Sequence, residues 1–135
     1  MTNLTNKILN ILQTIEGIET VMCDNSHSAN VRIDRNATPA ALLYTLPDWT
    51  INISKGIYKE RIDIQVFFFD RVNFDSKADT KLEIFENMNL FAKEFIRKLL
   101  SDSELRVLND EVNITATYGK FDSFVAGCTV NVTIE

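Results

Sequence analysis

The sequence contains few of the residues from which catalytic and metal sites are usually built. It has one histidine, His27, and two cysteines, Cys23 and Cys128, which are far apart and form no C-x-x-C pair. His27 lies in a polar stretch without the Gly-x-Ser-x-Gly turn of a serine hydrolase. One histidine and two distant cysteines do not make a metal site. We therefore expect no catalytic, cofactor-binding or metal-binding residues, and we expect both cysteines to be reduced and buried.

Glycine-rich loops, basic runs and long apolar runs are also missing. The four glycines are single and scattered, which excludes a phosphate-binding loop. The net charge is −5 without any run of lysine and arginine, so the chain is poorly suited to grip the phosphates of nucleic acid. No stretch approaches the roughly 18 uninterrupted apolar residues that a membrane span needs. Because the N-terminal segment is also too polar for a signal peptide, we expect a cytosolic protein that does not bind membranes.

Two pairs of acidic residues are the remaining candidates for acid–base chemistry. Asp70 with Asp75 and Asp102 with Glu104 are close in sequence, as catalytic carboxylates can be. Both pairs fall in predicted loops or at a helix end, where capping and solvation explain carboxylates equally well. We therefore expect the protein not to be an enzyme.

The spacing of apolar residues predicts two amphipathic helices, over about residues 3–16 and 77–101. The stripe of the first helix is Leu4, Ile8, Ile11, Leu12 and Ile15. The main stripe of the second is Leu82, Phe85, Met88, Ala92, Phe95, Ile96 and Leu99, and Ile84, Phe91 and Leu100 widen it.

Alternating apolar and polar residues predict the strands. Residues 49–54 and 57–69 form a hairpin that turns at Lys55-Gly56, and a second hairpin, from Val112 to Ile134, closes the chain. Residues 40–46 form a further strand, and residues 18–23 form either a short strand or an irregular return. The order is therefore a helix, three or four strands, a long helix and two strands. It predicts one α+β domain over residues 1–135, with a single, mostly antiparallel sheet and both helices packed on one face.

The aromatic run Phe67 to Phe69 raises the question of what covers the second face of this sheet. Phe68 continues the apolar row of the strand toward the helices, whereas Phe67 and Phe69 point to the opposite face. An apolar patch that no local element covers is typical of a protein–protein interface. We therefore expect a subunit interface formed by Phe67, Phe69, Phe74 and Val125.

Two other interpretations of these aromatic residues stay open. The polar segment 24–38 can fold back over the second face, which would bury the rings within the chain. A base-stacking surface is disfavoured, because Gln65 and Asp70 flank the run and only Arg71 is basic.

The order of these elements resembles the tail-terminator and tail-completion proteins of long-tailed bacteriophages. The matching segments are "TNKILNILQTI", "YKERIDIQVFFFD", "ADTKLEIFENMNLFAKEFIRKLL" and "AGCTVNVTIE", which together cover most of the chain. The likeness lies in element order, length and patterning, and residues 24–38 have no aligned counterpart.

The resemblance implies a non-enzymatic assembly role. Subunits of this family form a homo-oligomeric, hexameric ring that caps the tail tube and joins it to the head connector. The resemblance thus implies a location in the host cytoplasm and then in the virion tail, without a cofactor. DNA would only pass through the ring, and an acidic channel wall would let it slide. The alternative is a small α+β domain that binds a ligand or partner as a monomer or dimer, with Phe67 and Phe69 as a pocket wall.

Overall fold

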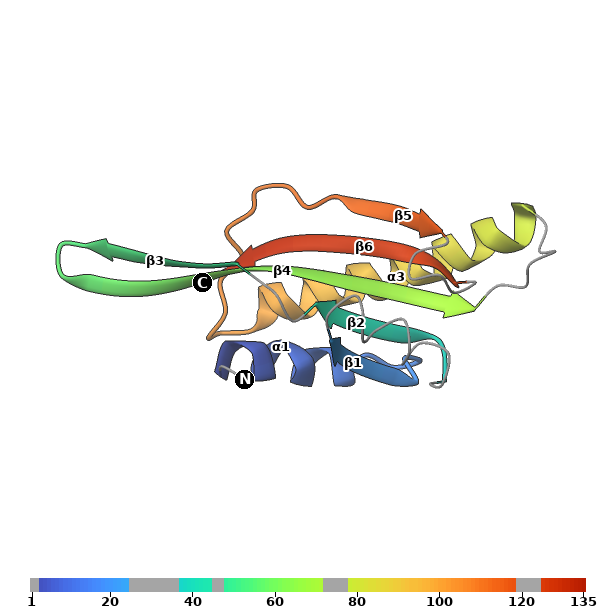
Figure 1. Ribbon diagram of the computed structural model, residues 1–135, viewed down its shortest axis with the longest axis horizontal. Helices are drawn as coiled ribbons and strands as arrows, with labels where there is room; N and C mark the ends of the chain where they lie inside the picture. Colours follow the sequence, from blue (N-terminus) through green and yellow to red (C-terminus); the bar gives the residue numbers. More distant parts are fainter. Residues whose placement is uncertain (1–2, 25–36, 45–47, 72–77, 119–124) are drawn as a thin grey trace.

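The computed structural model describes residues 3–24, 37–44, 48–71, 78–118 and 125–135 (Figure 1). Their order of helices and strands is that expected from the sequence. The elements are α1 (Asn3–Gln13), β1 (Thr20–Asp24), β2 (Ala40–Tyr44), β3 (Asp48–Ser54), β4 (Ile57–Arg71), α3 (Ala78–Ser101), β5 (Ile114–Tyr118) and β6 (Val125–Ile134).

The strands form one mostly antiparallel sheet in the order β1-β2-β4-β6-β5, and β3 pairs with β4 outside this path. β1 and β2 are parallel, while the other strand pairs are antiparallel. Both helices contribute to one core cluster with the sheet, and α3 crosses behind β4 and β6 in the view of Figure 1. This arrangement confirms the predicted α+β class with both helices on one face.

The main core forms where the apolar row of β4 meets the stripe of α3. The ring centroids of Phe68 and Phe95 lie 5.9 Å apart, and both side chains are fully buried. The buried members of this cluster from α1, the turn after it, β4 and α3 are Ile8, Leu12, Ile15, Ile62, Ile64, Val66, Phe68, Met88, Ala92, Phe95 and Leu99.

Two leucines of the predicted α3 stripe are not part of this core. Leu82 is 56% exposed and Leu100 is 67% exposed. They are 18 residues apart, so they share one side of the helix, about 120° around the axis from the buried Met88. The prediction that these two leucines face the sheet is therefore wrong.

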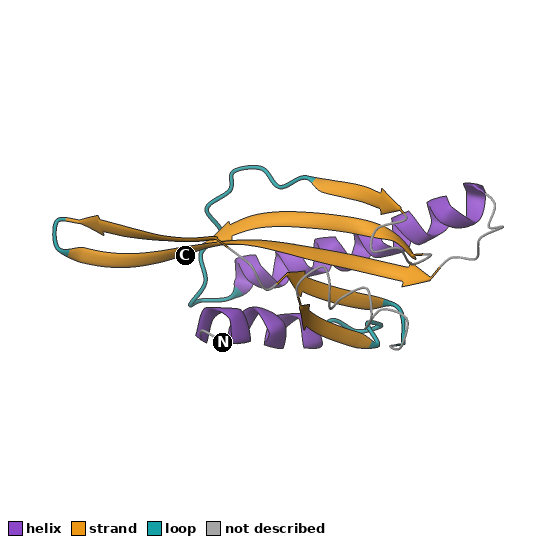
Figure 2. Cartoon of the chain, viewed as in Figure 1, coloured by secondary structure: helices purple, strands orange, loops and turns teal. Residues whose placement is uncertain are grey.

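The hairpin of β3 and β4 extends beyond the rest of the sheet (Figure 2). β6 pairs with β4 only from Ile62 onward, so residues 57–61 of β4 pair with β3 alone among the described strands. The turn consists of Lys55, with φ of 52°, and Gly56, with φ of 77°. Positive φ at both central positions is the type I′ geometry of two-residue hairpins, which confirms the predicted turn. We call residues 48–61 the arm.

One glycine is required by the close approach of two central strands. Gly127 of β6 pairs with Phe69 of β4. A Cβ atom added at Gly127 would lie 1.8 Å from the carbonyl oxygen of Phe68 and 2.8 Å from the Cα of Phe69. Any side chain at this position therefore forces the backbones of β4 and β6 apart.

We predict that Gly127→Ala lowers the free energy of unfolding by about 1–3 kcal/mol, the usual cost of overpacking a core. Urea denaturation measures this change. Asn131→Ala, at an exposed position of the same strand, is the control and should change the value by less than about 0.5 kcal/mol. Equal stability of Gly127→Ala and the parent chain would contradict the close approach.

Candidate partner-binding surface

The structure corrects the predicted subunit interface. Phe67 and Phe69 have no exposed area, and Val125 is 1% exposed. These side chains are therefore buried within a single chain, and a second copy cannot contact them. Phe74, the fourth predicted interface residue, lies outside the described residues, as does most of segment 24–38, the alternative cover for this face.

The three residues belong to a second core cluster on the face of the sheet opposite the helices. Its buried members are Met22, Ala40, Leu42, Phe67, Phe69 and Val125, with Tyr44 packed against them. The rings of Phe67 and Phe69 stack with their centroids 5.0 Å apart. The predicted orientation of these rings, away from Phe68 and the helices, is confirmed. The predicted exposure is wrong, because alternation indicates which face a side chain occupies and not what covers that face.

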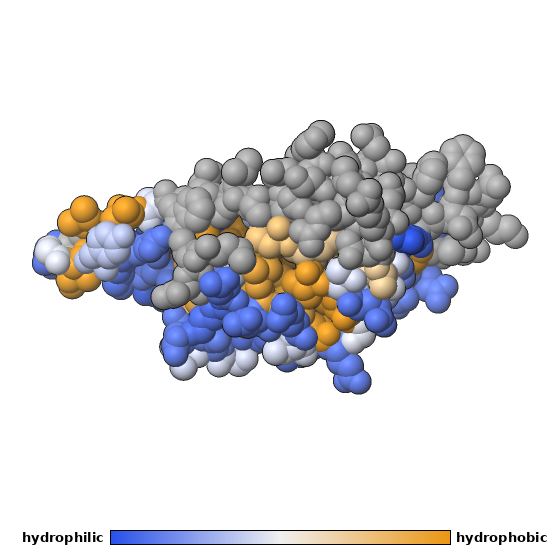
Figure 3. Space-filling view, turned by 60° about the horizontal axis from the view of Figure 1, so that its bottom comes forward, coloured by the Kyte–Doolittle hydropathy of each residue, from blue (hydrophilic) through white to orange (hydrophobic). Residues whose placement is uncertain are grey.

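The arm carries most of the large apolar side chains that the described residues expose. Ile51 is 52% exposed, Ile53 74%, Ile57 58% and Tyr58 64%. Figure 3 shows this apolar surface on the projecting arm, at the left of the view. Side chains of this size and exposure, concentrated on one projecting element, indicate a surface for binding another protein.

The register of the hairpin places the apolar side chains mainly on one face of the arm. Ile53 is opposite Tyr58, and Ile51 is opposite Glu60. Partners in a ladder share a face, and side chains two residues apart along a strand also share one. Tyr58 is therefore on the same face as Ile62, which is buried under the helices. The helix-covered face of the sheet thus continues onto the arm, where the described helices do not reach it.

The opposite face of the arm is mainly polar. It carries Thr50, Lys59 and Arg61, with Ile57 as its apolar member near the turn. Lys59 Nζ forms an ion pair with Glu135 Oε1 at 3.2 Å, which connects the arm to the end of β6. This contrast between the two faces makes the Ile51, Ile53 and Tyr58 face the candidate partner-binding surface.

A groove of about 360 Å³ lies between the end of α1 and the middle of α3. Its lining residues include Ile15, Glu16, Leu90, Phe91, Glu94 and Lys98. Leu90 is 62% exposed, whereas Ile15 is 4% exposed. The groove is therefore lined by both apolar and charged side chains, with Ile15 buried and Leu90 exposed. Sequence reasoning missed it, because the two walls are more than 70 positions apart in the chain.

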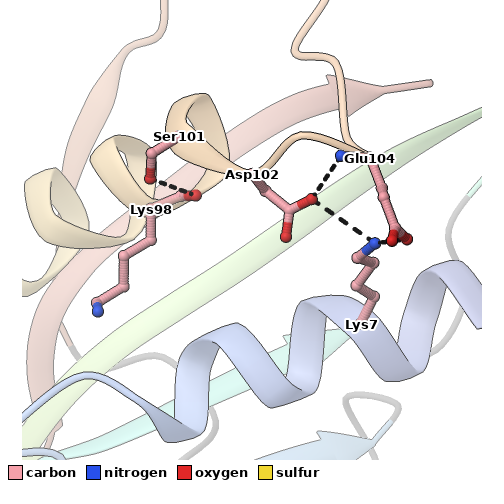
Figure 4. A network of polar contacts seen from close by, with 5 residues as sticks. All are labelled: Lys7, Lys98, Ser101, Asp102 and Glu104. Carbon is pink, nitrogen blue, oxygen red and sulfur yellow. Dashed lines mark hydrogen bonds and ion pairs between the residues drawn. The ribbon is translucent and has the colours of Figure 1, made fainter.

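A polar network holds α1 against the segment that follows α3 (Figure 4). Lys7 Nζ donates a hydrogen bond to Glu104 Oε2 and lies 3.6 Å from Asp102 Oδ1. The bond to Glu104 is the largest cause of the raised pKa of Lys7, and the Asp102 charge adds to it. Asp102 Oδ1 also accepts a 2.8 Å hydrogen bond from the backbone N–H of Glu104. This carboxylate pair, a sequence candidate for acid–base chemistry, therefore joins two segments of the fold.

The other sequence candidates for chemistry are not brought together. Cys23 and Cys128 are not joined in a disulfide, as expected, but only Cys128 is buried, and Cys23 is partly exposed. Burial raises the pKa of Cys128 to about 12. Among the described residues, no group of three or more His, Cys, Asp or Glu side chains is placed to hold a metal ion. His27 and Asp75 lie outside the described residues, while Asp70 Oδ1 accepts a hydrogen bond from the backbone N–H of Arg71. No helix in the described ranges is both long and apolar enough to cross a membrane.

Comparisons with known proteins do not assign the chain to a family. No protein-family model matches it, and a search of curated proteins found no significant match. The arm and the groove are therefore the features of the chain that bear on its function.

We predict that Phe69→Ala lowers the free energy of unfolding by about 3–5 kcal/mol, because the ring is fully buried in the second core cluster. Thermal and urea denaturation of the purified chain measure the loss. Ile57→Ala, at a 58% exposed position of the same strand, should cost less than about 1 kcal/mol. If the two variants are equally stable, Phe69 is not a core residue.

Proposed function

We propose that the protein is a non-enzymatic structural subunit that assembles with further copies of itself, as the bacteriophage tail-terminator proteins that it resembles do. The observation that carries this proposal is the exposed apolar face of the arm, with Ile51, Ile53 and Tyr58. The predicted interface at Phe67 and Phe69 no longer supports it, because those rings are buried.

An isolated hairpin such as the arm has low stability by itself. A two-stranded ribbon without a third strand or a covering helix is marginally stable in water. In the arm, residues 57–61 of β4 pair only with β3 among the described strands, and the apolar face has no described cover. A partner that packs on this face would stabilise the arm and remove its apolar side chains from water. The arm is therefore best explained as a binding element.

A ring follows if the partner is another copy. The arm and the body are different surfaces, so contact between them is heterologous, and a heterologous contact closes into a ring when the rotation between neighbours permits. The resemblance favours a hexamer that caps the tail tube and contacts the head connector. The net charge of −5 supports a channel wall that repels DNA and lets the genome pass. We place the subunit in the host cytoplasm before assembly and in the virion tail afterwards.

A second candidate is a small domain that binds a ligand or partner as a monomer or dimer. The groove between α1 and α3 favours it, because a concave site that combines apolar with charged side chains can bind a ligand. The pocket wall expected at Phe67 and Phe69 does not support this candidate, because both rings are fully buried.

We predict that the purified chain has a mass well above one subunit, near six times 15.4 kDa for a hexamer. Replacing Ile51 and Ile53 together by Thr should reduce the mass to one subunit, because the apolar face is lost while the β-branched shape is kept. Size-exclusion chromatography with light scattering measures the mass. Circular dichroism checks that the variant still folds.

Ile57→Thr is the matched control for this experiment. Ile57 is 58% exposed on the same arm, but it pairs with Ser54 and lies on the opposite face. We expect Ile57→Thr to keep the oligomer. A parent chain that stays monomeric at high concentration would exclude the assembly proposal and favour the second candidate.

A further inference from the structure

We propose that the arm of one copy docks in the groove between α1 and α3 of the next copy. This inference rests on the proposed self-assembly and names the surface that receives the arm. The occupant of the groove is therefore a second copy of this chain, and its residues 51–58 supply the contact.

The apolar contents of the two surfaces match. The arm presents Ile53 and Tyr58 side by side, at 74% and 64% exposure. The groove is lined by Leu90, which is 62% exposed, and by the half-buried Phe91. Docking would bury apolar side chains of both copies at once, which is the pattern of paired anchors at the centre of an interface.

The charges of the two surfaces are complementary. The docking segment, residues 51–58, contains one charged residue, Lys55, in a chain with a net charge of −5. The next two residues are Lys59, which is paired with Glu135, and Glu60. Glu16, Glu94 and Lys98 line the groove. Glu94 is paired with Arg97 at 3.5 Å and with Lys98 at 4.0 Å, so Glu16 is the groove charge that is open to a new partner. Lys55 and Glu16 are both exposed, and neither forms an ion pair within the described part of the chain. Opposite charges at these two places would orient one copy against the next, although the copies repel each other overall.

The placement of the two surfaces favours contact between copies over contact within one. In the view of Figure 1 the arm projects past the end of the body where α1 begins. The groove lies at the other end of α1, at Thr14, Ile15 and Glu16. An arm that points away from its own groove can reach the groove of a neighbour in a head-to-tail arrangement, as a ring requires.

The first test uses two leucines of the same helix. Leu90→Ser removes the exposed leucine of the groove, and Leu82→Ser removes a leucine of similar exposure, 56% against 62%, that does not line the groove. We expect Leu90→Ser to need at least a tenfold higher concentration to assemble, by light scattering, while Leu82→Ser assembles like the parent chain. Equal behaviour of the two variants would overturn the inference.

The second test reverses the charges. Lys55→Glu alone and Glu16→Lys alone should each weaken assembly about tenfold, because each places like charges together. The chain with both changes should recover most of the lost assembly. In a head-to-tail ring of this double variant, each interface again brings opposite charges together at positions 55 and 16, with their signs exchanged. No recovery in the double variant would show that the two residues do not meet.

A mixing experiment separates the two surfaces. The variant with Ile51 and Ile53 replaced by Thr keeps its groove, and Leu90→Ser keeps its arm. Mixed together, they should form a one-to-one heterodimer with one intact contact and should assemble no further. Larger assemblies, or none at all, would contradict the arm-in-groove contact.

These outcomes distinguish failure of the inference from failure of the proposed function. If the parent chain is monomeric, self-assembly is wrong and the inference falls with it. If the parent chain assembles and the arm variant dissociates while Leu90→Ser does not, self-assembly stands and the groove is not the acceptor. If Leu90→Ser dissociates and the arm variant does not, the groove receives a different surface, which also overturns the inference.

Discussion

The length of β4 is the constraint on which the rest of the structure depends. The strand has 15 residues, and its partner β6 has 10. Along residues 66–69, β2 and β6 pair with its two edges, and its two faces contribute Phe68 to one core and Phe67 to the other. Residues 57–61, on the N-terminal side of Ile62, do not pair with β6, but the alternation of side chains continues through them. The same pattern that builds the core therefore leaves an apolar face on the arm.

The sequence predicts the elements well because their signals are local. Alternation and helical spacing predict the order of elements, and the Lys55-Gly56 turn predicts the hairpin. Burial of the second face depends on packing between distant segments, so the exposure predicted for Phe67 and Phe69 was wrong. Alternation also predicts a strand that contains Ile51 and Ile53. It does not predict that this strand extends beyond the helices, which leaves both side chains exposed. A signal for this was present in the sequence, since the predicted β4 is longer than the strands beside it.

The subunit has a different surface at each end, with the arm at one end and the groove toward the other. Lys7 holds α1 to Asp102 and Glu104 after α3. The network therefore fixes α1, and the turn after it that lines one side of the groove, relative to α3, which lines the other side. A rigid acceptor loses little entropy when it binds, and a preorganised type I′ turn limits the same cost in the arm. The proposed ring would thus use surfaces shaped by the fold of the single chain, with the buried aromatic run stabilising each subunit.

Hydrogen exchange of the arm tests the central claim most directly, because it reports burial of this element without any substitution. If the arm docks on another copy, amides of residues 48–61 exchange more slowly at high protein concentration than at low concentration. Amides of residues 66–69 in the inner half of β4 should exchange slowly at both concentrations, since β2 and β6 already pair with both edges there. Fast exchange of the arm at every concentration, with the inner half still protected, would contradict the account.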